Sequence, residues 1–229
     1  METKMFDTLL ELPLFQGLSR DDLTRILEST HLTFSTLKRG ATLFQQDDLC
    51  TGLTFVLDGE LCQNTLSADR TWSVDEQLDS RSVIGLDVLY GSTRTHRHTY
   101  KSLCSTRLMQ MDKRTAGALI GYFEVFRLNV LNRLTTQAIR QTQARWLPAA
   151  NTLCGRIVNF MRQHVERPAG PKTFHISQTQ LGAYMSVDYH YVGHAITQLE
   201  HEGLVTKGHR AIIIPSFETL LNYDANRTA

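Results

Sequence analysis

The chain has 229 residues, 41% of them hydrophobic, and a formal net charge of +1. This length exceeds that of a typical single domain, and the hydrophobic content is enough to build a core in each of two parts. No apolar run approaches the length that spans a bilayer, and residues 1–14 lack the basic and then apolar form of a signal peptide, so we expect a cytoplasmic protein with no membrane partner. The four cysteines are scattered, which argues against a disulfide framework or a zinc site and indicates core thiols.

The charge is distributed unevenly along the chain. Residues 139–229 hold 9 basic and 6 acidic side chains, a net charge of +3, together with six of the nine histidines, whereas residues 1–138 hold 15 and 17, a net charge of −2. Basic segments attract nucleic acid because they neutralise its phosphates. Because the bias is modest, we expect weak non-specific affinity, located in the C-terminal part.

The N-terminal part is predicted to be a short helix followed by strands. Ser19 is placed to cap a helix over 21–27. Apolar stretches follow within 38–47, 53–61 and 102–111, and the second contains an Asp58-Gly59 turn. Short strands at this spacing indicate a small barrel or sandwich, which we expect within residues 1–114.

A long helical tract is predicted from about residue 115 to 147. An apolar stripe with spacings of three and four residues is too narrow to bury a helix inside one domain and favours helix pairing between two chains. The alternative is a helix lying on its own barrel, for which Leu128 and Leu131 form a second apolar stripe; the two roles are compatible. The predicted dimer interface consists of Phe123, Phe126, Val130, Leu134 and Ala138.

A break is predicted after this tract. Pro148 ends the helix, and Asn151 can cap the next one, over 152–165. We therefore expect a hinge at 146–151 and a second domain over 148–229.

Two short helices joined by a tight turn are predicted within residues 176–205. Ser177 and Gln180 form a capping box at the start of the first helix, and Ser186-Val187 is the turn. Asp188 can cap the second helix, which ends at Gly203. The buried faces are predicted to consist of Leu181, Tyr184 and Met185 in the first helix and Val192, Ala195, Ile196 and Leu199 in the second. Two strands over 204–214 with a polar turn at 206–210 complete a winged helix-turn-helix, although any small helical hairpin needs similar features.

The outward face of the second helix favours DNA binding over a plain helical hairpin, because its rings and hydroxyls can reach base edges or phosphates and no carboxylate interrupts it before Glu200. We assign phosphate positioning to the start of the first helix and to the wing, and base contact to Tyr189, His190 and His194. Protonation of His190, His194 and His201 would strengthen binding toward acidic pH. The predicted DNA contacts are Ser177, Gln178, Asp188, Tyr189, His190, Tyr191, His194, Thr197, Lys207, His209 and Arg210.

The order of these parts resembles the CRP/FNR family of bacterial transcription regulators. The segments that carry the resemblance are Leu12-Pro13-Leu14-Phe15, Leu43-Phe44, residues 55–60, Val83-Ile84-Gly85, Gly155-Arg156-Ile157, the helix-turn-helix and Ile212-Ile213-Ile214. The resemblance implies an α+β fold: a β-roll or jelly-roll sensor domain like those that bind cyclic nucleotides (1–114), a dimerisation helix (115–147) and a winged helix (148–229). It also implies a homodimer that binds a two-fold operator in double-stranded DNA and has RNA polymerase as a partner.

The chain departs from this family where cyclic nucleotides bind. In cyclic-nucleotide-binding members, a Gly-Glu pair opens a phosphate cassette that closes with Arg and a hydroxyl residue, but here Leu86 follows Gly85. A leucine cannot accept a hydrogen bond from ribose, and leaving that hydroxyl unpaired costs about 1–3 kcal/mol, which argues against cyclic AMP. Counting at the family spacing from Gly85 puts His96 and Arg97 at the closing pair, whereas Arg94-Thr95 would restore that pair if the loop were two residues shorter. The predicted ligand-binding residues are therefore Gly85, Arg94, Thr95, His96 and Arg97.

The sequence leaves two interpretations of the predicted sensor domain open. Residues 94–100 form a solvated strand or loop in one reading. In the other the protein is a haem-based gas or redox sensor, with ligands among His96, His98, Cys104, Met109 and Met111. An iron–sulfur cluster is excluded because no cysteine precedes Cys50. Asp47 stands at a turn where the family usually has glycine, and aspartate tolerates the left-handed backbone expected there.

The sequence disfavours two other classes of function, an enzyme and a ligand-binding module without DNA binding. Glycine-rich phosphate loops, a Gly-x-Ser-x-Gly elbow and a compact set of acid, base and nucleophile are all missing from the sequence, so no catalytic residue is assigned. A dimeric ligand-binding module without DNA binding would need the barrel and the pairing helix but not the ring-bearing helix and its wing. We therefore expect a ligand- or signal-responsive regulator that binds DNA.

Overall fold

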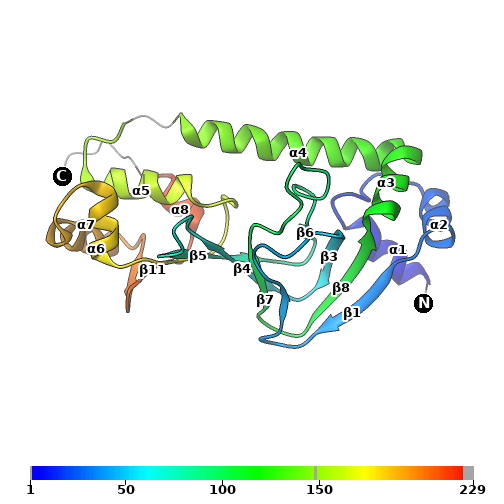
Figure 1. Cartoon of the computed structure of the whole chain (residues 1–229), viewed down its shortest axis with the longest axis horizontal. Coiled ribbons are helices and arrows are strands. Elements are labelled where there is room, and N and C mark those ends of the chain that lie inside the picture. Colours follow the sequence, from blue (N-terminus) through cyan, green and yellow to red (C-terminus); the bar gives the residue numbers. More distant parts are fainter. Residues whose placement is uncertain (1, 147–148, 224–229) are drawn as a thin grey trace. The chain divides into compact units, whose positions relative to one another are not determined.

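The computed structural model describes residues 2–146 and 149–223, and the chain divides into two compact units (Figure 1). The first comprises residues 1–62 and 78–138, and the second residues 63–77 and 139–229. The segment 63–77, expected in the N-terminal domain, therefore groups with the C-terminal part. Within the described residues, no helix is long and apolar enough to cross a membrane.

The first unit is a roll of two antiparallel sheets with helices at both ends of its sequence. The helices are α1 (Glu2–Leu10), α2 (Arg20–Ser29), α3 (Lys113–Tyr122) and α4 (Glu124–Arg145). The strands are β1 (Thr33–Leu37), β2 (Thr42–Phe44), β3 (Gly52–Asp58), β4 (Leu61–Leu66), β6 (Val83–Ile84), β7 (Thr99–Ser102) and β8 (Thr106–Asp112). One sheet has the order β1-β8-β3-β6, and β4, β7 and β2 are neighbours in the other.

Two apolar clusters hold this unit together. One lies between the two sheets and includes Val56, Leu108 and Tyr100. The other lies between the β1-β8-β3-β6 sheet and the helices, and at its centre Phe15 contacts Phe55 and Phe126, with ring centroids 5.5 and 5.3 Å apart. Alternation along β3 and β8 sends successive side chains to one cluster or the other.

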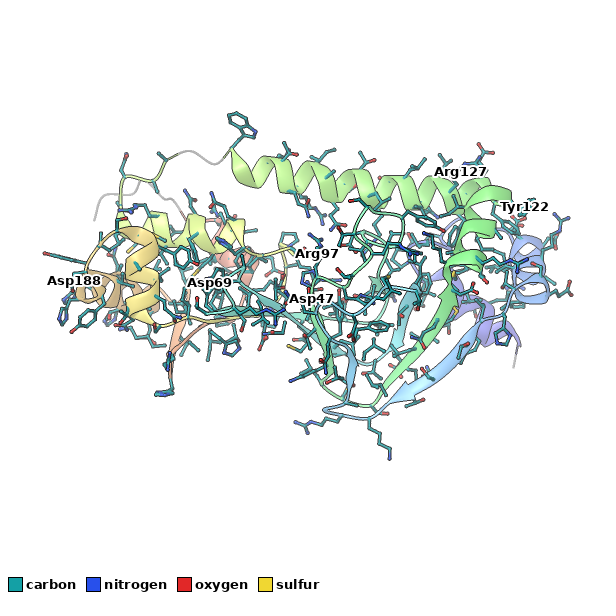
Figure 2. The ribbon with its side chains drawn as sticks, in the orientation of Figure 1. Asp47, Asp69, Arg97, Tyr122, Arg127 and Asp188 are labelled. Atoms are coloured by element: carbon teal, nitrogen blue, oxygen red, sulfur yellow. The ribbon has the colours of Figure 1, made fainter. Side chains whose placement is uncertain are left out.

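The predicted long helical tract is two helices. Phe123 separates α3 from α4 with an extended backbone (φ −111°, ψ 105°), and the Arg127 guanidinium donates to the carbonyl of Ile120 (3.2 Å), at the end of α3. Tyr122 and Arg127 flank this break (Figure 2). The long helix therefore begins at Glu124 and not at residue 115, because Phe123 leaves the helical conformation.

The apolar stripe assigned to dimer pairing faces the protein's own core. Phe126 is 0% and Val130 5% exposed, and both belong to the cluster beneath the helices; Phe123 and Leu134 pack against it. The pairing role expected for Phe126 and Val130 is thus wrong, because both are buried within one chain, where Phe123 and Leu134 are half-buried. Ala138 is exposed, and its place in a dimer interface stays a prediction. The alternative, a helix lying on its own barrel, is confirmed, but through this stripe. Exposed on the other side of α4 are Leu128 (54%), Leu131 (53%) and Ile139 (52%).

Turns and strands of the roll follow the sequence prediction in part. The Asp58-Gly59 turn is confirmed: Gly59 has φ +92°, and a Cβ there would lie 2.7 Å from the Thr106 hydroxyl oxygen. Asp47 adopts φ 76°, as expected for its turn. The strand predicted over 102–111 is interrupted, because the Ser102 and Thr106 hydroxyls both donate to the carbonyl of Cys104 in a turn.

The second unit combines four helices with an antiparallel sheet. Its elements are β5 (Ser73–Leu78), α5 (Leu153–Gln163), β9 (Lys172–His175), α6 (Gln178–Met185), α7 (Tyr189–His201), β10 (Thr206–Gly208), β11 (Ala211–Ile214) and α8 (Phe217–Leu221). The sheet order here is β10-β11-β9-β5-β4. Thr152, not Asn151, caps α5 by accepting from the amide of Gly155 (3.1 Å). Of the predicted hinge, 147 and 148 lie outside the described residues.

Candidate nucleic-acid interface

The start of α6 is fixed by the predicted capping box. The Ser177 hydroxyl oxygen accepts from the amide of Gln180 (3.2 Å), and the Gln180 side-chain oxygen accepts from the amide of Ser177 (2.9 Å). Both bonds hold the first turn in one conformation and leave its other amides at the helix end, where the helix dipole favours anions.

The turn between α6 and α7 requires a close approach of the two backbones. Ser186 adopts the left-handed conformation (φ 54°), and a Cβ at Gly182 would lie 2.8 Å from the carbonyl oxygen of Val187. Asp188 begins α7 by accepting from the amide of His190 (2.9 Å). This cap and turn confirm the sequence prediction and set the direction in which α7 leaves α6.

The two faces of α7 differ as the sequence predicts. Its buried face packs into the second unit's core and consists of Val192, Ala195, Ile196 and Leu199. On the outer face Tyr189, His190 and His194 are exposed, and the rings of Tyr189 and His190 lie 4.0 Å apart. Asp188 is exposed at the outer end of the helix (Figure 2).

The β10–β11 hairpin is hydrogen-bonded to α7. The Lys207 amide donates to the Glu200 carboxylate (2.8 Å), and its ammonium donates to the Thr197 hydroxyl oxygen. Thr197 in turn donates to the carbonyl of Gly193 (2.8 Å). Arg210, exposed in the turn at φ 53°, completes a surface that α6, α7 and the hairpin share.

The predicted DNA contacts are brought together in one unit and point outward. Nine of the eleven are exposed, and Ser177 and Thr197 are half-buried. Thr197 is already engaged in two hydrogen bonds, so it is less available for contact than its position on the outer face suggested.

Two residues of this surface have supporting roles that sequence reasoning missed. The Arg156 guanidinium donates to the carbonyl of Met185 and so caps the last turn of α6. Gly193 of α7 lets the Gln178 side chain approach, because a Cβ there would lie 3.1 Å from its amide oxygen. Both contacts join residues distant in sequence, and only the small size of Gly193 within a helix was a signal.

In the first unit, Gly85 is required by packing. It has φ +90°, and a Cβ would lie 2.8 Å from the carbonyl oxygen of Gly52 and 2.9 Å from the sulfur of Cys50. Leu86 is buried in the core beneath the helices. The residue that replaces the family's glutamate therefore serves packing.

The segment 94–98 is a loop with one isolated bridge, in which Arg94 and Arg97 are exposed, as expected for a solvated loop, whereas His96 and His98 are buried. The amide of His96 donates to the carbonyl of Asp48 (2.8 Å), and its ring stacks on Phe44 with centroids 4.1 Å apart. Burial lowers the pKa of His96, while Asp87 and Asp48 oppose this shift. As a haem ligand, His96 would have to leave this stack.

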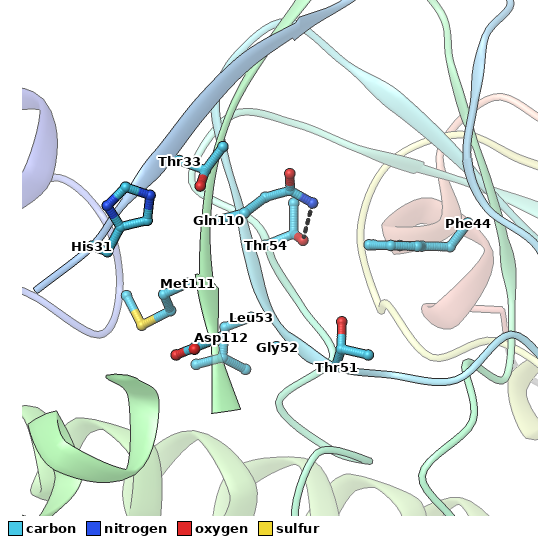
Figure 3. A pocket seen from close by; sticks show the side chains of 10 residues that line it. All are labelled: His31, Thr33, Phe44, Thr51, Gly52, Leu53, Thr54, Gln110, Met111 and Asp112. Carbon is cyan, nitrogen blue, oxygen red and sulfur yellow. Dashed lines mark hydrogen bonds between the residues drawn. The ribbon is translucent and has the colours of Figure 1, made fainter. Parts of the chain in front are cut away.

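Of the five predicted ligand-binding residues, Gly85 and Arg94 both lie beside Cys50, whose amide donates to the carbonyl of Arg94 (2.8 Å); their role in ligand binding stays a prediction. Arg97 pairs with Asp87 (2.6 Å), Arg94 is exposed and His96 is buried. A pocket of about 260 Å³ opens elsewhere in the first unit (Figure 3). It is lined by His31, Thr33, Phe44, Thr51, Gly52, Leu53, Thr54, Gln110, Met111 and Asp112, and the Gln110 amide donates to the Thr54 hydroxyl oxygen (3.3 Å). This set of described residues contains no Lys or Arg to neutralise a phosphate.

Comparisons with known proteins identify the fold. No protein-family model and no curated protein matches the sequence. The crystal structure of the Thermus thermophilus catabolite activator protein is similar over 91% of this chain and 96% of its own, with 20% identity and a TM-score of 0.50. The sensor domain of the transcriptional regulator DNR from Pseudomonas aeruginosa is similar over 66% of this chain and 97% of its own, with 17% identity and a TM-score of 0.52. The chain therefore has the CRP/FNR-like fold that the sequence resemblance implied.

Proposed function

We propose that this protein is a DNA-binding transcription regulator that reads a two-fold operator through a winged helix-turn-helix. The observation that carries the proposal is the outer face of α7, where Tyr189, His190 and His194 are exposed while the opposite face is fully packed. Exposed tyrosine rings beside imidazoles carry donors and acceptors that suit contacts with base edges in a major groove.

In this proposal, phosphate and base contacts come from different elements. The first turn of α6, with Ser177 and Gln178, and the basic turn of β10–β11 hold the DNA backbone. The start of α7 enters the groove. Because Tyr189, His190 and Tyr191 follow the Asp188 cap in place of an arginine, the operator differs from half-sites in which arginine contacts guanine.

A second copy of the chain would pair through the exposed side of α4. Leu128, Leu131 and Ile139 lie within about 80° of one another around a helix of 3.6 residues per turn, so they form an apolar stripe on one side of α4. Pairing of two such helices buries this stripe and gives the two-fold axis that a palindromic operator requires.

The signal is proposed to act on the roll of the first unit. Leu86 in place of an acidic residue and the absence of basic side chains among the described residues that line the Figure 3 pocket both disfavour a cyclic nucleotide there. A neutral polar molecule fits the threonine and amide groups of that lining better.

Fluorescence anisotropy tests the proposal. The full chain would be titrated against duplex DNA from its own upstream region and against sequences selected from a random library. We expect one selected palindrome to bind at least a hundredfold tighter than random duplex at physiological salt. Equal affinity for all duplexes, or no binding by a folded dimer, would leave a ligand-binding module without DNA recognition.

A further inference from the structure

The β4–β5 hairpin, residues 63–77, supplies a strand to the sheet of the second unit. β5 pairs antiparallel with β9, in the register Ser73 to His175 through Glu76 to Lys172. Strand β9 therefore has β5 on one side and β11 on the other. Addition of an edge strand satisfies backbone groups along β9 that would otherwise face water.

The tip of the hairpin also contributes to the core of this unit. Trp72 is 6% exposed and lies against Phe160 and Phe174, with ring centroids 5.2 and 6.4 Å away. Its indole nitrogen donates to the hydroxyl oxygen of Tyr184 on α6 (2.9 Å). A buried indole with its N–H satisfied is a strong anchor, because it combines a large apolar area with a directional bond.

A second hydrogen bond joins the hairpin to the first turn of α6. The Gln180 side-chain nitrogen donates to the carbonyl of Thr71 (2.8 Å), while its oxygen closes the capping box with Ser177. Gln180 and Tyr184 are four residues apart and so share one face of α6. Gln178, two residues before Gln180, points to a different side of the helix.

Polar contacts along β5 also join the hairpin to the second unit. The Asp75 carboxylate lies 2.7 Å from the His175 ring nitrogen, and the Glu76 carboxylate accepts from the amides of Glu166 (3.0 Å) and Arg167 (2.9 Å). The hairpin is thus bonded to the second unit at its tip and along β5.

From these contacts we infer that the β4–β5 hairpin positions α6 for DNA contact, with Trp72, Tyr184 and Gln180 as positioning residues. The inference rests on the proposed function and extends it to the residues that hold α6 in place. Leu61 and Leu78, at the base of the two strands, pack in the core between the sheets of the first unit.

The first test uses operator affinity in the full chain. Tyr184→Phe removes only the hydroxyl that accepts from Trp72, and we expect operator affinity to fall about two- to tenfold. The slope of affinity against salt concentration should stay unchanged, because no phosphate contact is lost. Tyr90→Phe is the matched control: it removes a hydroxyl in the first unit that donates to the carbonyl of Lys113 (3.3 Å). Equal affinity of the Tyr184 variant and wild type would overturn the inference.

The second test does not depend on DNA, so failure of the proposed function can be told apart from failure of this inference. Trp146, the second tryptophan, is 83% exposed, and Trp146→Phe leaves Trp72 as the sole tryptophan. In that background we expect blue-shifted Trp72 emission that resists quenching by iodide. Adding Tyr184→Phe should increase quenching and speed amide hydrogen exchange in β9 and the first turn of α6. Water-like emission before that change, or unchanged exchange after it, would contradict docking of the hairpin.

Discussion

Glu76 and Lys172 form a fully buried pair, with the carboxylate oxygen 3.8 Å from the ammonium nitrogen, and they join β5 to β9. Burial raises the pKa of Glu76 and lowers that of Lys172, while each charge opposes the shift of the other. The two residues differ in the number of further hydrogen bonds that they make. Glu76 also accepts from the two amides of Glu166 and Arg167, and Lys172 donates to the carbonyl of Ala169 (2.5 Å).

This inequality predicts that the two residues differ in their effect on stability. Glu76→Leu leaves a buried ammonium and two amides without their acceptor, which should cost about 3–5 kcal/mol of unfolding free energy. Lys172→Met leaves a carboxyl that keeps both amide donors and can take up a proton, so we expect a smaller loss. Urea denaturation followed by tryptophan fluorescence measures both, and the double variant should be more stable than Glu76→Leu alone. A Lys172→Met loss as large as that of Glu76→Leu would contradict the assignment.

The stacked pair of Phe44 and His96 predicts a pH dependence of stability. Burial holds the pKa of His96 below its usual 6.5, so the unfolded chain binds a proton that the folded chain excludes. Stability from this group is present above pH 6.5 and is lost as pH falls through that value toward the lower folded pKa. His96→Phe keeps a ring against Phe44 and removes the titration. The unfolding free energy of wild type relative to His96→Phe should therefore fall on acidification, and a constant difference would rule the mechanism out.

The two sides of α4 predict opposite outcomes for two substitutions. Leu131→Glu places a charge in the exposed apolar stripe and should give folded monomers in sedimentation analysis, whereas Gln141→Glu, at an exposed position about 80° or more around the helix from the stripe, should leave the dimer intact. Phe126→Ala removes a fully buried ring and should cost about 3–5 kcal/mol of stability. A Leu131→Glu protein that remains dimeric would place the pairing surface elsewhere.

The turn between α6 and α7 predicts a contrast between two glycines. An alanine at position 182 would meet the backbone oxygen of Val187 at 2.8 Å, and backbone cannot move aside as a side chain can, so Gly182→Ala should destabilise by about 1–3 kcal/mol. At position 193 the neighbour is the flexible Gln178 side chain at 3.1 Å. Gly193→Ala also gains helix propensity, so we expect its thermal unfolding midpoint to match or exceed that of wild type. The reverse order would refute this account of the turn.

The sequence predicted best what depends on neighbouring residues. The caps at Ser19, Ser177 and Asp188 join atoms two or three residues apart, and each was predicted from residue type and spacing alone. The pairing of Asp75 with His175 joins residues 100 apart, and no local pattern indicated it. On α4 both sides carry apolar residues, so periodicity revealed two stripes but not which one the roll would cover. Assigning them required the packing around Phe126.

Arg210 and His194 predict how affinity and selectivity separate at the proposed DNA surface. Arg210 lies in the β10–β11 turn, where a guanidinium reaches phosphate whatever the base sequence, so Arg210→Ala should weaken all duplexes alike and reduce the salt slope by about one. His194 lies on the exposed face of α7, and His194→Ala should weaken the selected operator more than random DNA, by about 1–3 kcal/mol at one base position. Arg39→Ala, an exposed arginine of the first unit, serves as the control for charge alone. If Arg210→Ala changed base preference while His194→Ala changed only the salt slope, α7 would not be the element that reads the sequence.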